Sequence, residues 1–296
     1  MKKNFKKSIA IIVGESTGLL FLKKIIIERN SFFNICYVVN SDKKYDSEVK
    51  KICKKNRIIF FSKKDFLKKE RIIIKINKKC NFLISVYSSL ILSKSFLKSL
   101  NYQCYNFHPG ILPFYPGKNC VSGAIYNSEK EIGVTIHKMA RQVDSGKILM
   151  IGKIKINKNE NLLSAMRNLR ILVIKLLYKF LKAMKYSKKF HFKKNDQKKI
   201  RFYPKYIPNS GLIDKNLTFD ELYKRYKASD TGPFPNSWGR LFFRFNKKKF
   251  FIKEIKKKFL PKKNNSLVKK INNETFLIKI KNVDILVKAQ NDKRYR

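Results

Sequence analysis

The chain has 296 residues with 69 Lys and Arg against 20 Asp and Glu, so its formal net charge at pH 7 is +49. Hydrophobic residues make up 44% of the chain, which is enough for a buried core and excludes a wholly disordered protein. Only 12 of the basic residues are Arg, and Lys occurs in almost every segment. This pattern is typical of compositional drift, and it predicts non-specific affinity for anions. A nucleic-acid-binding surface, by contrast, has its basic residues clustered on one face.

Short apolar runs alternate with helical stretches over the first third of the chain. The runs predict five strands, at residues 8–14, 34–40, 58–62, 82–87 and 102–107. The stretches between them predict four helices, at residues 19–29, 46–55, 64–75 and 93–100. This alternation indicates an α/β fold with a Rossmann-like, open and mostly parallel sheet. Ligands of such sheets bind beyond the carboxyl ends of the strands, so the residues after Phe107 are the candidates for chemistry.

The rest of the chain predicts a second, smaller domain. Residues 161–184 form the clearest helix, because apolar residues recur there at steps of three and four. A polar, Lys-rich stretch follows, so we expect a catalytic domain over residues 1–187, a linker over 188–206 and a C-terminal domain over 207–296. A helix up to residue 227 should precede five short strands, at residues 241–245, 250–255, 266–271, 275–280 and 283–288. So many short strands predict a small OB-like β-barrel.

The five cysteines, at positions 36, 53, 80, 104 and 120, are odd in number and include no Cys-x-x-Cys pair. They fit neither a disulfide framework nor a zinc site and indicate a reducing compartment. The apolar run after the N-terminal lysines is too short for a signal peptide. No segment approaches the roughly 20 apolar residues of a membrane helix. We therefore expect a cytoplasmic protein that does not bind a membrane.

Residues 106–117, NFHPGILPFYPG, begin in the last two positions of the fifth predicted strand and continue beyond it. Their two Gly and three Pro predict a rigid, irregular loop. Asn106 and His108 are two residues apart, so their side chains share a face in extended geometry. This pair suits acyl transfer, because a His can move a proton while an Asn stabilises an oxyanion. For an isolated Asn-x-His the commoner interpretation is structural, with Asn106 capping a turn and His108 satisfying a buried backbone group.

A second segment, EIGVTIHKMARQVDSGKI at residues 131–148, predicts a strand and then a turn that contains one carboxylate, Asp144. Together the two segments resemble the formyltransferases that use 10-formyltetrahydrofolate. That family carries Asn-x-His and Leu-Leu-Pro-x-x-x-Gly, then Gly-Val-Thr-x-His and Asp-x-Gly. The similar residues here are 106–108, 111–117, 133–137 and 144–146.

The resemblance implies transfer of a formyl group from N10 of the folate to a primary amine, with Asn106, His108 and Asp144 as the catalytic residues. Asn106 and protonated His108 would stabilise the oxyanion, and Asp144 would hold the imidazole. No metal is expected, and we interpret His137 as structural. The resemblance places the folate at the end of the fourth strand and in the later turn, with contacts from Tyr87, Ser88, Leu90, Ile91, Met139, Gln142 and Val143.

Residues 228–235, ASDTGPFP, and the predicted strands after residue 241 resemble, in degenerate form, the tails of methionyl-tRNA formyltransferase and of the formyltransferase acting on UDP-4-amino-4-deoxy-arabinose. The length of this C-terminal part disfavours the compact glycinamide ribonucleotide branch. The basic insertion of the tRNA enzyme is missing at residues 40–47, and its Arg-Gly-Ala-Ala-Pro stretch is replaced at residues 116–120. We therefore expect a small-molecule amine acceptor, such as an amino-sugar nucleotide. The acceptor contacts would come from Gly110, Tyr115, Lys118 and Arg141.

Two alternatives stay open at this point. The first is methionyl-tRNA as the acceptor, which the basic tail, the predicted barrel and the many lysines favour. The second is a non-catalytic basic binding protein on the same scaffold, which the complete Asn-His-Asp set disfavours. The sequence leaves the oligomeric state undetermined.

Overall fold

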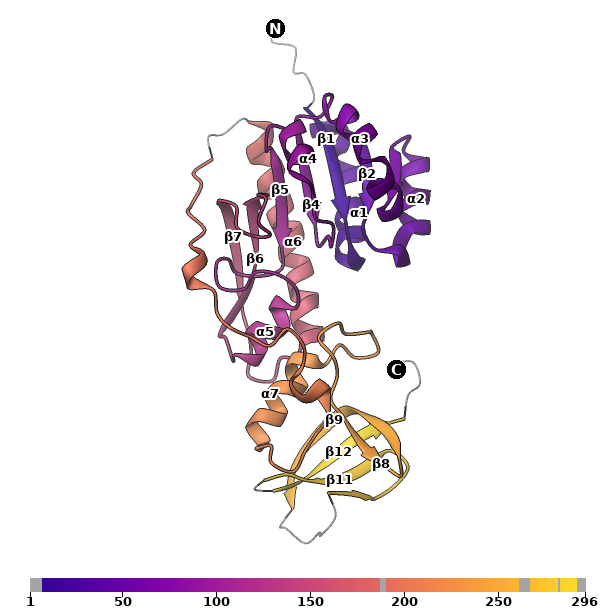
Figure 1. Cartoon of the computed structure of the whole chain (residues 1–296), viewed down its shortest axis with the longest axis vertical. Coiled ribbons are helices and arrows are strands. Elements are labelled where there is room, and N and C mark those ends of the chain that lie inside the picture. The colour runs from indigo at the N-terminus through magenta and orange to yellow at the C-terminus, as the bar shows by residue number, and fades with distance from the viewer. Residues whose placement is uncertain (1–6, 187–189, 261–266, 282, 292–296) are drawn as a thin grey trace. The chain divides into compact units, whose positions relative to one another are not determined.

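The structure, a computed structural model, describes residues 7–186, 190–260, 267–281 and 283–291, and the chain divides into two compact units (Figure 1). The first unit comprises Met1–Gly117, Gly133–Ile154 and Asn168–Ile200. The second comprises Lys118–Ile132, Lys155–Arg167 and Arg201–Arg296. The two units alternate along the chain. The last change from the first unit to the second, between Ile200 and Arg201, falls within the expected linker of residues 188–206. Residues 188 and 189 of that linker lie outside the described residues. The domain boundaries stay a prediction.

A seven-stranded sheet runs through the first unit in the order β3-β2-β1-β4-β5-β6-β7. Strands β1 to β5 are parallel, and β6 is antiparallel to β5. This arrangement confirms the expected mostly parallel α/β sheet. The strands are β1 (Lys7–Val13), β2 (Phe33–Asn40), β3 (Ile59–Ser62), β4 (Phe82–Val86), β5 (Cys104–His108), β6 (Glu131–Lys138) and β7 (Ile148–Lys155).

Helices connect the parallel strands, as the sequence predicts. They are α1 (Glu15–Phe32), α2 (Asp46–Lys55), α3 (Lys63–Asn77) and α4 (Lys94–Ser99), and the long α6 (Leu162–Lys185) follows β7. The start of α3 shows how neighbouring residues determine where a helix begins. Ser62 and Asp65 form a capping box that satisfies backbone N–H groups at this helix end. Among the described residues, no helix combines the length and the apolar character needed to cross a membrane.

The sequence predicts neither α5 (Cys120–Tyr126) nor β7. Helix α5 is short, and its N-cap residue Asn119 has a left-handed backbone and makes no capping hydrogen bond through its side chain, so no start signal marks it. Strand β7 lies at the sheet edge and contains Gly152, where a Cβ would lie 2.8 Å from Leu172 of α6. Strand β7 therefore depends on a packing partner that is distant in the sequence, and so does α5, whose Gly123 lies against the ring of Tyr203.

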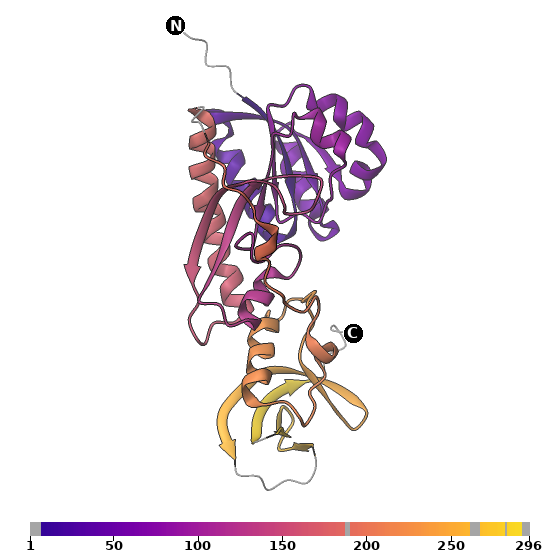
Figure 2. The same ribbon diagram turned by 60° about the vertical axis from the view of Figure 1, so that its left-hand side comes forward.

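Helix α6 packs along the first sheet (Figure 2). Its Phe180 is fully buried and meets three aromatic rings of the sheet edge-on. The ring centroids lie 6.0 Å from Phe82, 5.2 Å from Tyr105 and 5.7 Å from Phe107. Because Phe107 separates Asn106 from His108 in β5, this packing fixes the strand that carries both polar side chains.

In the second unit, a helix precedes a five-stranded antiparallel sheet in the order β10-β11-β12-β9-β8. The helix is α7 (Phe219–Ser229), and the strands are β8 (Phe242–Phe245), β9 (Lys248–Leu260), β10 (Val268–Lys270), β11 (Thr275–Lys279) and β12 (Asp284–Gln290). The expected five strands are confirmed, although residue 266, where one was expected to begin, lies outside the described residues. Closure into an OB-like barrel stays a prediction.

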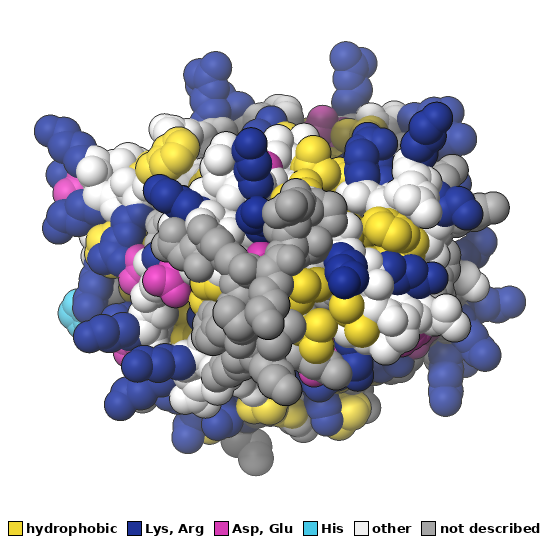
Figure 3. Space-filling view, turned by 90° about the horizontal axis from the view of Figure 1, so that it is seen from below, with side chains coloured by type: hydrophobic (Ala, Val, Ile, Leu, Met, Phe, Trp, Pro, Cys, Tyr) yellow, Lys and Arg dark blue, Asp and Glu magenta, His cyan; other side chains and the backbone are white. Residues whose placement is uncertain are grey.

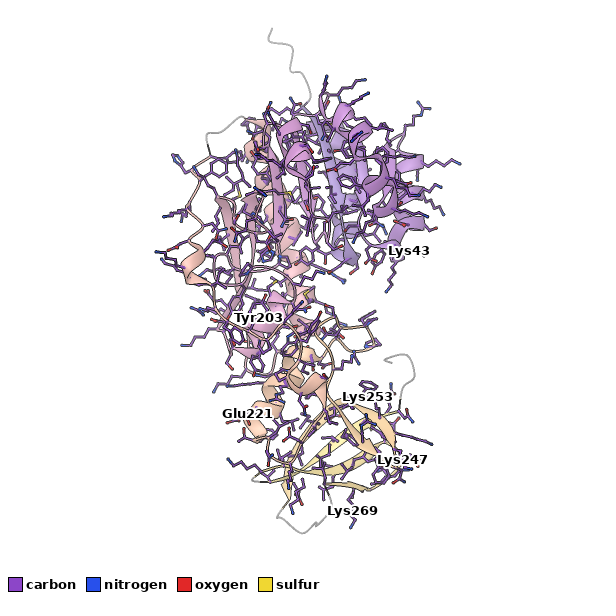
Figure 4. All side chains as sticks on the ribbon, viewed as in Figure 1. Lys43, Tyr203, Glu221, Lys247, Lys253 and Lys269 are labelled. Atoms are coloured by element: carbon purple, nitrogen blue, oxygen red, sulfur yellow. The ribbon has the colours of Figure 1, made fainter. Side chains whose placement is uncertain are left out.

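Lysine side chains are spread over the described surface. Lys247, Lys253 and Lys269 are exposed on the C-terminal sheet and its turns, and Figure 4 shows them projecting from it. On the face shown in Figure 3, Lys and Arg side chains are distributed around the outline and separated by hydrophobic and uncharged groups. This distribution agrees with the interpretation of the charge as compositional drift.

Phe180→Ala is expected to lower the free energy of unfolding by about 3–5 kcal/mol, because it removes a buried ring between α6 and the sheet. Tyr178→Ala is the matched control on the same helix: Tyr178 is 42% exposed, so its loss should cost less than about 0.5 kcal/mol. Urea denaturation followed by circular dichroism measures both values. Equal losses in the two variants would contradict the packing described here.

Candidate functional site

Asn106 and His108 lie on the same face of β5, because successive residues of a strand point to opposite sides. Phe107 points to the other side and packs edge-on against Phe21 of α1, with 5.3 Å between the ring centroids. His108 is buried and Asn106 is half-buried. The strand thus anchors itself through an apolar side chain on one face and presents an amide and an imidazole on the other.

Asp144 lies in the turn between β6 and β7 and is 8% exposed. Its Oδ2 lies 3.4 Å from Nδ1 of His108 and accepts a 2.9 Å hydrogen bond from the backbone N–H of Gly117. Its Oδ1 lies 3.5 Å from Nδ2 of Asn106. The structure therefore brings the three expected catalytic residues together from two separate segments.

The structure also places His137 in this group. The antiparallel pairing of β5 and β6 sets His137 opposite Asn106. Its Nε2 lies 3.3 Å from Oδ1 of Asp144 and 3.2 Å from Nδ2 of Asn106. The sequence does not reveal these contacts, because the register between two strands depends on tertiary packing and on the connection between them.

Each of the two imidazoles lies between a backbone carbonyl and the same carboxylate. Nε2 of His108 lies 2.7 Å from the carbonyl oxygen of Tyr115, and Nδ1 of His137 lies 2.8 Å from that of Lys138. A carbonyl oxygen can only accept, so these two nitrogens are the donors. The other nitrogen of His108 faces Asp144, where a protonated ring makes a second, charge-assisted hydrogen bond. Nε2 of His137 faces both Asp144 and the side-chain nitrogen of Asn106, from which it can accept a hydrogen bond. The geometry therefore suits an imidazolium at His108 beside the carboxylate.

Opposing effects act on the pKa of Asp144. Burial raises this pKa, whereas the hydrogen bond from His137, the nearby charges of His108 and His137, and the N–H group of Gly117 lower it. The net pKa of Asp144 lies well below the ordinary value of an aspartic acid. The carboxylate is therefore ionised at neutral pH and presents a permanent negative charge to both rings.

The Pro- and Gly-rich loop after β5 is attached to β6 through Thr135, which pairs with His108 across the two strands. The Thr135 hydroxyl donates to the carbonyl of Gly110 at 2.7 Å and accepts from the N–H of Leu112 at 3.0 Å. Position 110 has no room for a side chain, because a Cβ would clash with the carbonyl oxygen of Tyr115 and lie 2.6 Å from Nε2 of His108. The loop thus brings a carbonyl acceptor onto the imidazole.

The residues expected to contact the folate lie after β4 and in the turn after β6: Tyr87, Ser88, Leu90, Ile91, Met139, Gln142 and Val143. The two stretches meet, because Met139 packs against the buried cluster that contains Leu90. Tyr87 is buried with a left-handed backbone, whereas Ile91 and Val143 expose 73% and 53% of their surface. An apolar ligand could cover these exposed side chains.

The four residues expected to contact an acceptor differ in placement. Gly110 and Tyr115 lie beside His108, as described above. Arg141 is exposed in the turn that leads to Asp144. Lys118 is exposed at the start of the second unit, where its carbonyl accepts a 2.9 Å hydrogen bond from the hydroxyl of Tyr203. Within the described ranges, no group of three or more His, Cys, Asp and Glu side chains could hold a metal ion.

Known proteins resemble this chain in sequence. A family model described as Formyl transferase matches residues 6–179. The bifunctional polymyxin resistance protein ArnA of Wigglesworthia glossinidia brevipalpis is 31% identical over 202 residues, which cover 68% of this chain and 31% of ArnA. Methionyl-tRNA formyltransferase of Thermotoga maritima is 25% identical over 185 residues, which cover 62% of this chain and 59% of that enzyme. The chain therefore spans less than two thirds of the length of either relative.

A solved structure shares the fold over almost the whole chain. It is the crystal structure of WlaRD, a sugar 3N-formyl transferase, in the presence of dTDP and 5-N-formyl-THF, and its TM-score is 0.68. The match covers 97% of this chain and 98% of WlaRD at 17% sequence identity. At this identity the likeness establishes the fold alone.

Asp144→Asn is expected to flatten the pH dependence of stability. Because folding lowers the pKa of Asp144, its charge stabilises the fold above about pH 4, the pKa in an unfolded chain, and this contribution is lost as the pH falls further. The stability difference between wild type and variant should therefore shrink towards acid pH. Urea denaturation at a series of pH values measures it, with the exposed Asp220→Asn as control. Parallel curves for wild type and Asp144→Asn would contradict this expectation.

Proposed function

We propose that this chain, which belongs to the formyl transferase family, transfers a formyl group from 10-formyltetrahydrofolate to a primary amine. The observation that carries the proposal is the contact of Asn106 and His108 with the buried carboxylate of Asp144. Acyl transfer needs an oxyanion donor and a proton carrier held in one place, and this cluster supplies both. All three residues lie within the segment that matches the family.

In the proposed reaction the amine nitrogen attacks the formyl carbon and forms a tetrahedral intermediate with an oxyanion. Asn106 and protonated His108 stabilise that oxyanion. Asp144 keeps the imidazole oriented and charged through the contact with Nδ1. Nε2 of His108 donates to Tyr115 in the structure, so the formyl oxygen has to share or displace that hydrogen bond. The attacking nitrogen gives up one proton, and collapse of the intermediate breaks the bond between the formyl carbon and N10 of the folate, which takes up one proton in exchange.

The folate is proposed to lie against the stretches after β4 and β6. These stretches meet where Met139 packs on the cluster of Leu90, and they expose the apolar side chains of Ile91 and Val143. A ring system that covers both side chains could form hydrogen bonds through its polar edge with the neighbouring backbone groups. The crystal structure of WlaRD in the presence of 5-N-formyl-THF supports a folate-derived formyl donor.

The acceptor is proposed to be an amino-sugar nucleotide or a similar small amine. The fold match to WlaRD, a sugar 3N-formyl transferase, extends over 97% of this chain and supports this choice. The connection after β2 also supports it: only the single turn η1 (Lys43–Tyr45) separates β2 from α2, which leaves no room for a basic insertion. Gly110, Tyr115, Lys118 and Arg141 stay the proposed acceptor contacts, and each of the two cations suits a phosphate or a carboxylate of the acceptor.

Methionyl-tRNA is the second candidate acceptor. The likeness to the Thermotoga maritima methionyl-tRNA formyltransferase and the exposed lysines of the second unit favour it. A non-catalytic basic binding protein on the same scaffold is the third candidate. The complete contact set of Asn106, His108 and Asp144 opposes it, since a binding protein has no need of a buried carboxylate beside two imidazoles.

Three further features belong to the proposal. Residues 1–187 are the proposed catalytic domain and residues 188–206 the linker, and the passage between the units at Arg201 supports this division. Within residues 207–296 the five antiparallel strands would close into an OB-like barrel. A cytoplasmic location is supported by the five free cysteines.

His108→Ala and Asn106→Ala should each lower turnover by at least ~10²-fold, the size of a lost proton carrier or oxyanion donor. Binding of 10-formyltetrahydrofolate should change little, because both groups act mainly on the transition state. Single-turnover assays and calorimetry separate the two effects. His191→Ala, on an exposed ring in the segment after α6, is the matched control. Near-normal turnover of His108→Ala would show the catalytic assignment to be wrong.

Binding of RNA should be weak and non-specific if the acceptor is a small amine. Its affinity should fall steeply between ~50 and ~200 mM salt, as expected for contacts with phosphates alone. Replacing Lys247, Lys253 and Lys269 by Gln should weaken the binding of all tRNAs equally, because these exposed side chains would contact phosphates and not bases. Competition binding near ~150 mM salt measures the preference. A tenfold or greater preference for charged initiator tRNA would favour methionyl-tRNA as the acceptor.

A further inference from the structure

Asn195 lies in the segment after α6 and is 8% exposed. Its side-chain nitrogen donates to two carbonyl oxygens of the catalytic turn, at 2.7 Å to that of Asp144 and 3.0 Å to that of Gly146. A primary amide carries two N–H groups, so this one side chain satisfies both carbonyls. Asn195 therefore clamps the turn across sequence separations of 51 and 49 residues.

The turn depends on such a clamp. Asp144 has a φ of 51°, in the left-handed region, which Asp adopts more readily than most other non-glycine residues. The side chains of residues 141–143, which precede it, are exposed, so packing does not fix the turn from that side. Gly146 comes so close to the carbonyl of Lys138 that a Cβ would clash with it. Hydrogen bonds to the backbone of the turn therefore set the position of the Asp144 carboxylate together with the contacts that its own oxygens make with Gly117, His108 and His137.

Asn195 is itself held in place. The backbones of Lys193 and Ile148 exchange two hydrogen bonds, of 2.8 and 2.9 Å, which attach the segment to the start of β7. Nε2 of Gln197 donates to Oδ1 of Asn195 at 3.0 Å. With its oxygen engaged there, the amide turns its nitrogen towards the carbonyls of Asp144 and Gly146. The clamp is thus built into the first unit, in a stretch that the sequence marks only as a polar linker.

We propose that Asn195 is a positioning residue that holds the Asp144 carboxylate between the imidazoles of His108 and His137. The inference rests on the proposed formyl transfer, in which Asp144 orients His108. Without the clamp, two buried carbonyls lose their donors, and the carboxylate can leave its 3.4 and 3.3 Å contacts with the rings. A misplacement of about 1 Å can cost on the order of 10²-fold in rate.

The first test does not require an acceptor. The chain has three histidines, so selective ¹⁵N labelling of histidine gives a spectrum with three imidazoles. Asn195→Ala should move the ring resonances of His108 and His137 and leave the exposed His191 in place. Lys194→Ala, at the exposed neighbouring position, is the matched control and should move none of them. Unchanged resonances of His108 and His137 in a folded Asn195→Ala protein would overturn the proposal.

Turnover provides the second test, with 10-formyltetrahydrofolate as donor and UDP-4-amino-4-deoxy-arabinose or dTDP-3-aminofucose as probe amines. Asn195→Ala should lower kcat at least ~10-fold. In an Asp144→Asn background the same change should cost less than ~2-fold, because the clamp acts only through that carboxylate. Equal losses in both backgrounds would indicate an independent structural role for Asn195 and would overturn the proposal.

The two tests also separate this inference from the proposed function. If the wild-type protein formylates neither probe amine, the proposed transfer to amino-sugar nucleotides fails, while the histidine spectra still decide the role of Asn195. Asn195→Asp keeps the shape of the side chain but removes both donors, and it should move the same resonances. It therefore replaces the Ala variant if circular dichroism shows that the latter does not fold.

Discussion

The carboxylate of Asp144, buried between two imidazoles, is the interaction on which the rest of the site depends. An ionised group that is 8% exposed is stable only when polar partners replace the water that it has lost. Those partners are the N–H of Gly117 and the rings of His108 and His137. Because they come from the loop after β5, from β5 and from β6, one carboxylate joins three stretches of chain.

The topology of the sheet explains why these stretches meet. After β5 the chain runs through the Pro- and Gly-rich loop and α5, and β6 then pairs with β5 in antiparallel orientation. That pairing sets His137 opposite Asn106 and Thr135 opposite His108, and the two histidine rings lie 6.3 Å apart. The turn that follows β6 then carries Asp144 back over the end of β5. The change from parallel to antiparallel pairing is thus the structural basis of the site.

The high positive charge lies mostly outside this arrangement. Exposed lysines such as Lys247 and Lys269 are surrounded by water and salt, which screen their fields over about 8 Å at physiological ionic strength. The site instead depends on short, buried contacts that screening hardly reaches. Lysine can therefore accumulate on the surface while the Asp144 contacts persist, which explains how a chain with a net charge of +49 retains a complete buried charge cluster.

The sequence by itself determined the features that have a local cause. The alternation of strands and helices up to β5 follows from side-chain periodicity, the shared face of Asn106 and His108 follows from their spacing of two, and Asp144 stands out within a family motif. Only the tertiary structure decided where α5 and β7 form, that His137 contacts Asp144, and that Asn195 clamps the Asp144 turn. Helix α5 lacks a side-chain cap, β7 depends on α6, and Asn195 acts across 51 residues. Contacts of this kind leave no period or spacing in the sequence, because they depend on which segments pack together and in what register.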